Sequence, residues 1–169
     1  MSERIIYLPE RKTARHAFLP MTRRCFAMFF TFLTTLFTPS AFAQTLDCTH
    51  TVTLGNIDVC VQLAKTETEQ ARGLQGQKSL RDGQGMLFVF SPAKKVCMWM
   101  KDVPIDLDVG FFSSDGSLLS ISTMKAQTET LHCSKAPVSY ALEMRGGWFA
   151  DHKVTAGTPI IIKKGRLPQ

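Results

Sequence analysis

The chain has 169 residues, a formal net charge of +6 and a sequence pI of about 9.2. Most of the excess positive charge lies near the start, because residues 1–43 contain six basic and two acidic residues, whereas the remaining 126 contain 14 basic and 12 acidic ones. A net charge of only +2 on these 126 residues argues against nucleic-acid binding, and their number suits one domain with one hydrophobic core.

Residues 1–43 have the pattern of a secretory signal peptide. The pair Arg23-Arg24 precedes an apolar run from Cys25 to Phe37, and Ala41-Phe42-Ala43 supplies the small residues that a signal peptidase accepts. We therefore expect cleavage after Ala43 and a mature domain, residues 44–169, that is periplasmic or secreted.

The apolar run is shorter than the roughly 20 residues needed to cross a bilayer. We therefore expect membrane contact only through this segment during export, with an uncleaved anchor as the alternative. Translation from Met21 instead of Met1 is a second open alternative, because it would give a signal of more usual length.

Four cysteines follow the signal: Cys48, Cys60, Cys97 and Cys133. An even number of cysteines in an exported chain predicts two disulfides. Of the three pairings we favour Cys48 with Cys60, which flank a predicted hairpin, and Cys97 with Cys133. Free thiols that bind a metal are the alternative, although the chain has no Cys-x-x-Cys pair.

Residues 49–65 alternate apolar and polar side chains around Gly55-Asn56, which predicts a β-hairpin. A two-residue turn there places Thr51 opposite Cys60. A bridge from Cys48 to Cys60 therefore requires a bulge or an irregular strand start.

A short helix is predicted over residues 66–73, because Thr66 and Glu69 have the spacing of a capping box and Gly73 can end the helix. Residues 75–84 are glycine-rich and charged, which is typical of an exposed loop.

Three apolar, strand-like runs follow, separated by Ser91-Pro92 and Val103-Pro104, and these runs are expected to form the core: 86–90, 96–100 and 107–112. The later elements are predicted in this order: a strand at 117–124, a long loop at 125–137, a strand at 138–144, a helical turn at 148–153 and a last strand at 158–163. Strands thus outnumber helices, which predicts an α+β, mostly β fold: a single small domain with a strongly curved, barrel-like sheet and one or two short helices.

Several short motifs have the order and spacing of a known family: Ala71-Arg72-Gly73-Leu74, the run from Gly85 to Phe90, Trp99-Met100-Lys101, Leu107-Asp108, Tyr140-Ala141-Leu142-Glu143 and Gly146-Gly147-Trp148. From about residue 49 to residue 162 the chain resembles the family catalogued as domain of unknown function 192. This resemblance implies a small, β-rich, exported protein and implies no established reaction.

Four charged residues lie within apolar runs: Arg72, Lys101, Asp108 and Glu143. Burial of an ion is costly unless the ion has a partner or a purpose, so these four and Trp99 are our candidate ligand-binding residues. A structural ion-pair cluster, or strand residues that face water, is the alternative.

Aromatic residues could line the same pocket, although core packing is their usual role: Trp99, Trp148, Phe88, Phe90 and Tyr140. Soft ligands for monovalent copper also occur close together: Cys97, Met98, Met100, His132 and Cys133. Because Cys97 is expected to point away from the two methionines, no metal and no cofactor is predicted.

The chain has no familiar catalytic or nucleotide-binding signature. The first hypothesis is therefore a non-catalytic exported domain that binds a small polar ligand or an envelope protein. The second is an envelope hydrolase that acts on polysaccharide or peptide, with Asp108 and Glu143 as its acid/base pair. Carboxyl groups about 5 to 10 Å apart in a cleft would permit the second hypothesis, and carboxyl groups on opposite faces of a sheet would exclude it.

Overall fold

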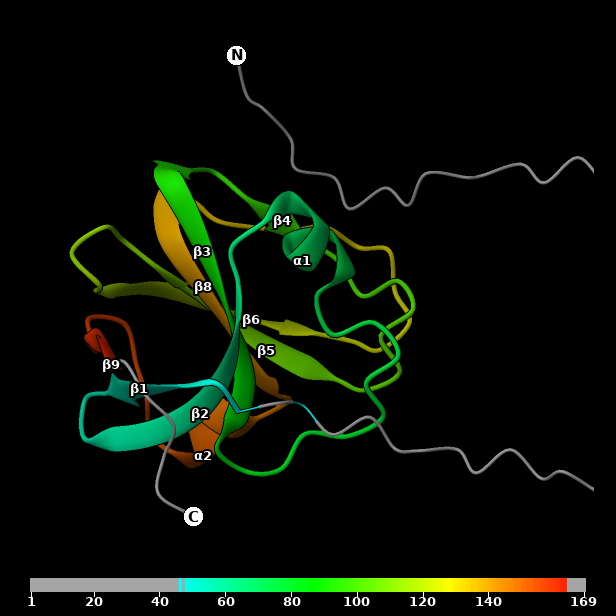
Figure 1. Ribbon diagram of the computed structural model, residues 1–169, viewed down its shortest axis with the longest axis horizontal. Helices are drawn as coiled ribbons and strands as arrows, with labels where there is room; N and C mark the ends of the chain where they lie inside the picture. The colour runs from blue at the N-terminus through cyan, green and yellow to red at the C-terminus, as the bar shows by residue number, and fades with distance from the viewer. Residues whose placement is uncertain (1–45, 47, 164–169) are drawn as a thin grey trace, which may run out of the picture. The chain divides into compact units, whose positions relative to one another are not determined.

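The structure is a computed structural model that describes residue 46 and residues 48–163 (Figure 1). The predicted signal peptide, residues 1–43, lies outside the described residues. In chain order the elements are β1 (His50–Leu54), β2 (Ile57–Ala64), α1 (Glu67–Arg72), β3 (Gln84–Lys94), β4 (Cys97–Met98), β5 (Leu107–Phe112), β6 (Leu118–Met124), β7 (His132–Cys133), β8 (Val138–Arg145), α2 (Trp148–Asp151) and β9 (Ile160–Lys163).

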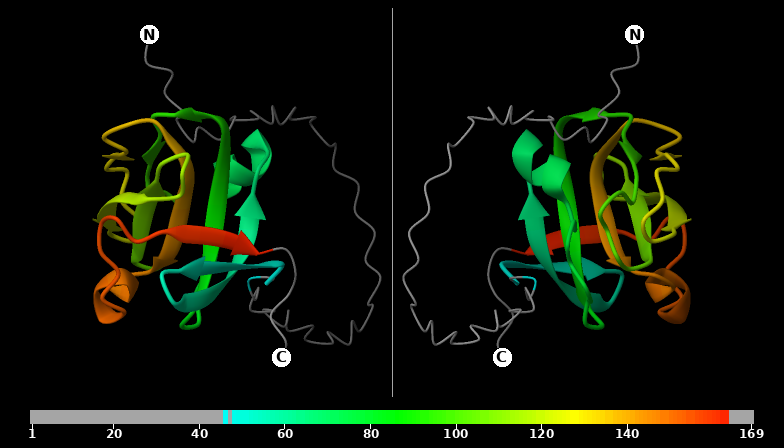
Figure 2. Two further views of the ribbon diagram at one scale, coloured as in Figure 1. Left: turned by 90° about the vertical axis from the view of Figure 1, so that its left-hand side faces the viewer. Right: turned by 90° about the vertical axis from the view of Figure 1, so that its right-hand side faces the viewer.

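Seven of the strands form one curled sheet in the order β6-β5-β8-β3-β2-β1-β9, and β4 and β7 form a separate two-stranded ribbon. Within the large sheet β2 and β3 are parallel, and all other neighbours are antiparallel. The sheet curls into a half-barrel, with α1 and α2 at opposite ends (Figures 1 and 2). The predicted mostly β fold with a strongly curved sheet and two short helices is thus confirmed.

Each face of the curled sheet has its own hydrophobic core, because successive side chains of a strand point to opposite faces. The face that we call the β4 face is covered by the segment that contains β4, and its core includes Phe88, Met98, Val109 and Ala141. The other, which we call the α2 face, packs on Trp148 and Phe149 of α2, and its core includes Leu87, Phe112, Leu142 and Met144. All six residues of β5 are buried, which explains why that strand is apolar except for Asp108 instead of alternating.

The first hairpin forms as predicted around Gly55 and Asn56, with Thr51 directly opposite Cys60. Cys48 lies just before β1, and the structure joins it to Cys60 across a Cα–Cα distance of 5.5 Å. The irregular strand start that this bridge requires is therefore present.

Helix α1 begins with the predicted capping box. The Thr66 hydroxyl accepts a hydrogen bond from the Glu69 backbone N–H, and the Glu69 carboxylate accepts one from the Thr66 N–H. Gly73 ends the helix with a φ of +47°, in the left-handed region that glycine adopts readily. The buried Gln70 side chain donates to the Val89 carbonyl at 2.8 Å, which fastens the helix to β3.

The predicted end of the first core strand is wrong. Strand β3 continues through Ser91-Pro92 to Lys94, although these residues were expected to end it at Phe90. The pairing of β3 with β8 shifts its register between Val89 and Lys94. Proline lacks the N–H that a regular ladder needs, so it is tolerated at such an irregularity.

The run at 96–100 was predicted as a core strand, but only Cys97 and Met98 are in β-structure, and they pair with β7 instead of the large sheet. Their partners, Cys133 and His132, lie in the segment expected to be a long loop. Cys97 and Cys133 are directly opposite and joined by a disulfide, with a Cα–Cα distance of 3.9 Å. Val96, Met98 and Met100 of the run are still buried, because they cover the sheet instead of extending it.

None of the helices among the described residues is both long enough and apolar enough to span a bilayer.

Candidate functional site

A small pocket lies on the β4 face, between the end of α1 and the segment that follows β4. It encloses about 300 Å³ of empty space, including its open mouth. The sheet contributes Phe88 and Glu143, the end of α1 contributes Arg72, Gly73, Leu74 and Gln75, and the opposite wall consists of Met98, Trp99, Lys101 and Val103. Four of the five predicted ligand-binding residues therefore line one pocket.

Glu143 is the buried polar group of this pocket. It lies on β8, directly opposite Met86 of β3 on one side and Val109 of β5 on the other, and is only 5% exposed. Gly85 helps to fix its position, because a Cβ there would collide with the Glu143 backbone oxygen and the Met144 sulfur. No hydrogen bond or ion pair among the described residues involves its carboxyl group.

Burial raises the pKa of Glu143 to about 8, from an ordinary value of 4.5. A buried carboxylate loses the water that stabilises its charge, so the proton is retained to higher pH. Near neutral pH the Glu143 side chain is therefore mostly a neutral acid, which can both donate and accept a hydrogen bond.

Two cations flank this neutral acid. Arg72 is exposed at the end of α1 and has no ion-pair partner among the described residues. The Lys101 side chain is 38% exposed, with Nζ 5.6 Å from the Trp99 ring centroid and 3.9 Å from the Glu129 carboxylate. Glu129 is itself largely exposed, so this long pair is weak and leaves positive charge at the pocket.

Trp99 adds a second unmatched polar atom. Its Nε1 is buried and has no hydrogen-bond partner in the described part of the chain. Asp108 Oδ1 and Trp148 Nε1, which lie outside the pocket lining, are also buried without a partner among the described residues, so an unpartnered atom does not by itself distinguish the pocket.

The apolar lining of the pocket was only partly foreseen. Phe88 was among the aromatic residues expected to line it, whereas Phe90, Tyr140 and Trp148 do not. The other apolar lining residues were not singled out: Leu74, Met98 and Val103. No local pattern marks them, because apolar core and apolar pocket wall have the same composition.

Asp108 lies on the opposite face of the sheet from Glu143. On β5 it pairs with Met144, and its neighbour Val109 pairs with Glu143. Directly opposite residues share a face, so Asp108 points to the α2 face and Glu143 to the β4 face. The expectation that these carboxyl groups form an acid/base pair is therefore wrong, because the sheet separates them.

Comparison with known proteins gives a consistent family. Residues 50–162 match the model of DUF192, described as Uncharacterized ACR. The chain belongs to the DUF192 family. Among curated proteins, none is similar enough to this DUF192 chain to count as a relative.

Two crystal structures are similar to this DUF192 protein. One is of a protein from Sinorhizobium meliloti 1021 described as a candidate transcription regulator, with 29% identity, a TM-score of 0.65, and coverage of 67% of this chain and 92% of that one. The other is of a protein of unknown function from Novosphingobium aromaticivorans DSM 12444, with 28% identity, a TM-score of 0.64, and coverage of 66% of this chain and 83% of that one.

Two of the five possible copper ligands of this DUF192 domain are the cysteines of one disulfide. Cys97 and Cys133 are bonded to each other, which removes both thiolates. Within residues 48–163, no three or more His, Cys, Asp or Glu side chains gather where they could hold a metal ion.

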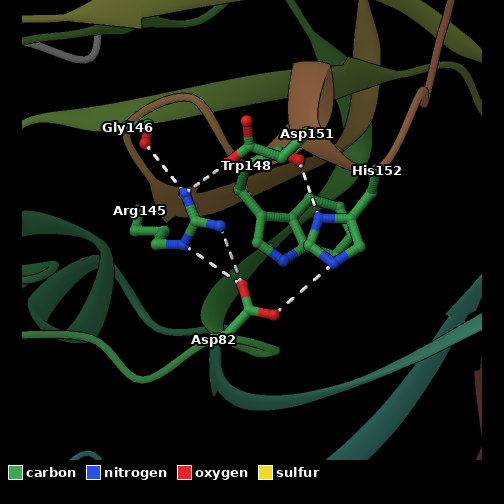
Figure 3. Close-up of polar contacts among 6 residues, drawn as sticks. All are labelled: Asp82, Arg145, Gly146, Trp148, Asp151 and His152. Atoms are coloured by element: carbon green, nitrogen blue, oxygen red, sulfur yellow. Dashed lines mark hydrogen bonds and ion pairs between the residues drawn. The ribbon is translucent and has the colours of Figure 1, made fainter.

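A second polar cluster, which the sequence reasoning missed, lies next to α2 (Figure 3). The Arg145 guanidinium donates to the Asp82 carboxylate at 3.1 Å and to the Asp151 carboxylate at 2.8 Å. His152 stacks on Trp148 with ring centroids 4.3 Å apart, and its Nε2 is 3.5 Å from Asp82. Asp151 and then Asp82 raise the pKa of Arg145.

The alternation of side chains along β8 could have placed one member of this cluster, because it puts Arg145 on the same face of the strand as Glu143. Asp82, however, is distant in sequence, and only the fold brings it to Arg145.

Proposed function

We propose that this DUF192 protein is an exported, periplasmic domain that binds a small polar ligand carrying a negative charge in the Glu143 pocket. The observation that carries the proposal is a buried carboxyl group without a protein partner, in a pocket flanked by two cations. Burial of an unmatched polar group is costly, and a ligand would supply the missing partner.

Binding is favoured over hydrolysis because the pocket holds a single carboxyl group. Glycoside and peptide hydrolysis by acid/base chemistry usually needs a second group that activates water, and Asp108 lies on the other face. A small ligand is favoured over an envelope protein because Glu143 is only 5% exposed, so a flat protein surface would not reach its carboxyl group.

Export is supported by the pattern of residues 21–43 and by the two disulfides, which persist mainly in oxidising compartments. Expression of the full chain in a Gram-negative host, followed by fractionation and N-terminal sequencing, tests it. We expect a periplasmic product that begins at Gln44 and has no free thiol under denaturing conditions. An Ala43→Asp variant should accumulate as the uncleaved precursor, and a cytoplasmic product with four reactive thiols would contradict export.

Binding is tested by thermal shift of the purified protein with small organic anions, inorganic anions, amines and neutral sugars. We expect only anions to raise the Tm, because they complement Arg72 and Lys101. The double variant Arg72→Gln/Lys101→Gln should lose this response.

Lys163→Gln is the matched control, because Lys163 is also exposed and paired, to Asp58 at 3.2 Å, but lies on β9 away from the pocket lining. A response to amines or sugars alone, or a response that survives in the double variant, would contradict the proposal.

A further inference from the structure

The Cys97–Cys133 disulfide lies on the solvent side of the ribbon formed by β4 and β7. Burial alternates along the segment that contains β4, where Val96, Met98 and Met100 are buried and face the core. Cys97, which lies between two of them, therefore points away from the core, and Cys133 shares its side because it is directly opposite. Cys133 is exposed and Cys97 is half-buried, so a thiol in solution can reach the bridge.

The second disulfide is less accessible. Cys60 is 6% exposed and lies on β2, between β1 and β3 of the large sheet. Its partner Cys48 is half-buried. The two bridges of one molecule therefore differ in access, and Cys48–Cys60 serves as an internal control.

Two lysines flank the Cys97–Cys133 bridge. Lys95 precedes Cys97 by two residues and Lys135 follows Cys133 by two residues, so the antiparallel register places the lysines opposite each other beside the bridge. Both lysines are exposed, and neither has an ion-pair partner among the described residues. Positive charge near a departing sulfur stabilises the thiolate, which favours thiol–disulfide exchange.

An exposed apolar side chain lies on the other flank of the bridge. Leu131 precedes Cys133 by two residues and is 50% exposed. A protein reductant can contact this side chain during the exchange, whereas a small thiol does not need it.

We propose that Cys97–Cys133 is a reducible disulfide that an exported dithiol oxidoreductase opens by thiol–disulfide exchange. A thiolate of the reductant attacks the Cys133 sulfur, forms a mixed disulfide with it and displaces Cys97 as a thiolate. The second thiol of the reductant then attacks the reductant's own sulfur in the mixed disulfide and releases Cys133. Two electrons pass to the bridge and the protons of the two reductant thiols end on the two cysteines, so the reductant leaves as a disulfide.

Opening of the bridge loosens one wall of the Glu143 pocket. The two residues that follow Cys97 line that pocket: Met98 and Trp99. The bridge thus regulates the pocket, and this consequence, unlike the exchange itself, rests on the function proposed above.

The domain is expected to stay folded when the bridge is open, because other contacts hold the ribbon. The Val96 N–H donates to the Ser134 hydroxyl at 3.1 Å, and the Ser134 N–H donates to the Val96 carbonyl at 2.8 Å. Met98 and Met100 remain anchored by burial in the core. Reduction should therefore raise the mobility of residues 96–101 without global unfolding.

The rate at which dithiothreitol reduces each bridge of the purified, oxidised protein is measured by timed alkylation and mass spectrometry. We expect Cys97–Cys133 to be reduced on the order of 100-fold faster than Cys48–Cys60, because only the former is open to attack. Lys95→Gln/Lys135→Gln should slow the faster reaction about tenfold, since the thiolate loses its stabilising charges. Lys78→Gln/Lys153→Gln, which removes the same charge outside the ribbon, is the matched control and should react like the unaltered protein.

A dithiol oxidoreductase whose second cysteine has been replaced by serine tests the protein partner, because it cannot resolve the mixed disulfide. We expect the trapped adduct on Cys133 and none on Cys48 or Cys60. Leu131→Gln should slow reduction by the intact oxidoreductase and leave reduction by dithiothreitol unchanged.

Hydrogen exchange tests the effect on the pocket wall. In Cys48→Ala/Cys60→Ala, which retains only the bridge of interest, dithiothreitol should accelerate exchange of the amides of residues 96–101 about tenfold or more. If this variant does not fold, the unaltered protein is sampled when only its faster bridge has been reduced. Thermal shift with small organic anions on the oxidised and the reduced form then compares their binding.

Equal reduction rates of the two bridges, or an adduct on Cys48 or Cys60, would overturn the proposal. Rapid reduction with unchanged amide exchange, or equal anion binding by both forms, would overturn its regulatory part. If neither form binds any anion, the function proposed above fails, whereas the reduction rates and the trapped adduct still decide whether the disulfide is a redox site.

Discussion

Glu143 and Arg145 lie two residues apart on the same face of β8, but their polar partners and their burial differ. Arg145 meets two carboxylates, Asp82 and Asp151, within 3.1 Å. Glu143 meets no polar partner among the described residues and is more deeply buried. The network explains the burial of Arg145 by structure alone, whereas Glu143 has no such network, which is why we propose that a ligand completes it.

The two residues also respond differently to their environment. Arg145 keeps its charge because its partners stabilise it, and its partial exposure limits the cost of burial. Glu143 has no such partner, so burial disfavours its ionised form and the carboxyl group keeps its proton to higher pH. The following predictions test this contrast, from the largest expected effect to the smallest.

Glu143→Gln should change how stability depends on pH. The pKa of Glu143 rises from 4.5 to about 8 on folding, so the stabilisation by its bound proton is complete below pH 4.5 and is lost as the pH rises to about 8. The variant has no proton to lose at this position. Between pH 4 and pH 9 the unaltered protein should therefore lose on the order of 4 kcal/mol more unfolding free energy than Glu143→Gln does.

Urea denaturation at pH 4, 6 and 9 measures this difference. Glu129→Gln is the control, because Glu129 is an exposed acid near the same pocket. Parallel pH curves for Glu143→Gln and the unaltered protein would show that Glu143 is ionised and solvated, and would remove the contrast with Arg145.

Loss of the Cys97–Cys133 disulfide should affect both stability and the pocket. This bridge joins residues 36 positions apart and holds the β4 wall, so Cys97→Ala/Cys133→Ala should cost about 3 kcal/mol of unfolding free energy and weaken ligand binding. The matched variant Cys48→Ala/Cys60→Ala removes a bridge of separation 12 that lies away from the pocket lining. It should cost somewhat less and leave binding unchanged. Equal effects of the two variants on binding would show that β4 does not depend on its disulfide.

Arg145→Gln should have the smallest effect. Its two ion pairs are partly exposed, so their loss should lower the free energy of unfolding by about 1 kcal/mol in dilute buffer and by less in 1 M salt. Ligand binding should be unchanged, because Arg145 does not line the pocket. Thermal denaturation at both salt concentrations measures the loss, and Lys125→Gln, which breaks one exposed pair with Asp106, is the comparison. A loss of ligand binding in Arg145→Gln would show that the Arg145 cluster and the Glu143 pocket belong to one site.

The sequence predicts the elements whose causes are local. Gly55 and Asn56 determine the first turn, and Thr66 with Glu69 determines the start of α1, because the interacting groups are only a few residues apart. Burial of Glu143 was also predictable from its apolar neighbours on β8.

Features that depend on distant partners could not be predicted in the same way. The Cys97–Cys133 bridge was predicted, but the pairing of β4 with β7 instead of with the large sheet depends on where residues 132 and 133 are placed by the fold. Likewise, alternation assigns neighbours in one strand to opposite faces, but the register between β5 and β8 decides that Asp108 and Glu143 are separated. A proline in sequence predicts a break, and only the tertiary structure shows that β3 tolerates one at an irregularity.

The parallel pairing of β2 with β3 has a consequence for how the shape of the pocket can change. Parallel neighbours cannot be joined by a tight turn, so the chain must return along the sheet before β3 begins. That return passage contains α1 and supplies residues 72–75 of the pocket. Substitutions or insertions in this connection can therefore reshape the pocket while the seven-stranded framework stays intact, which makes it the natural segment to exchange between family members when the proposed binding is tested.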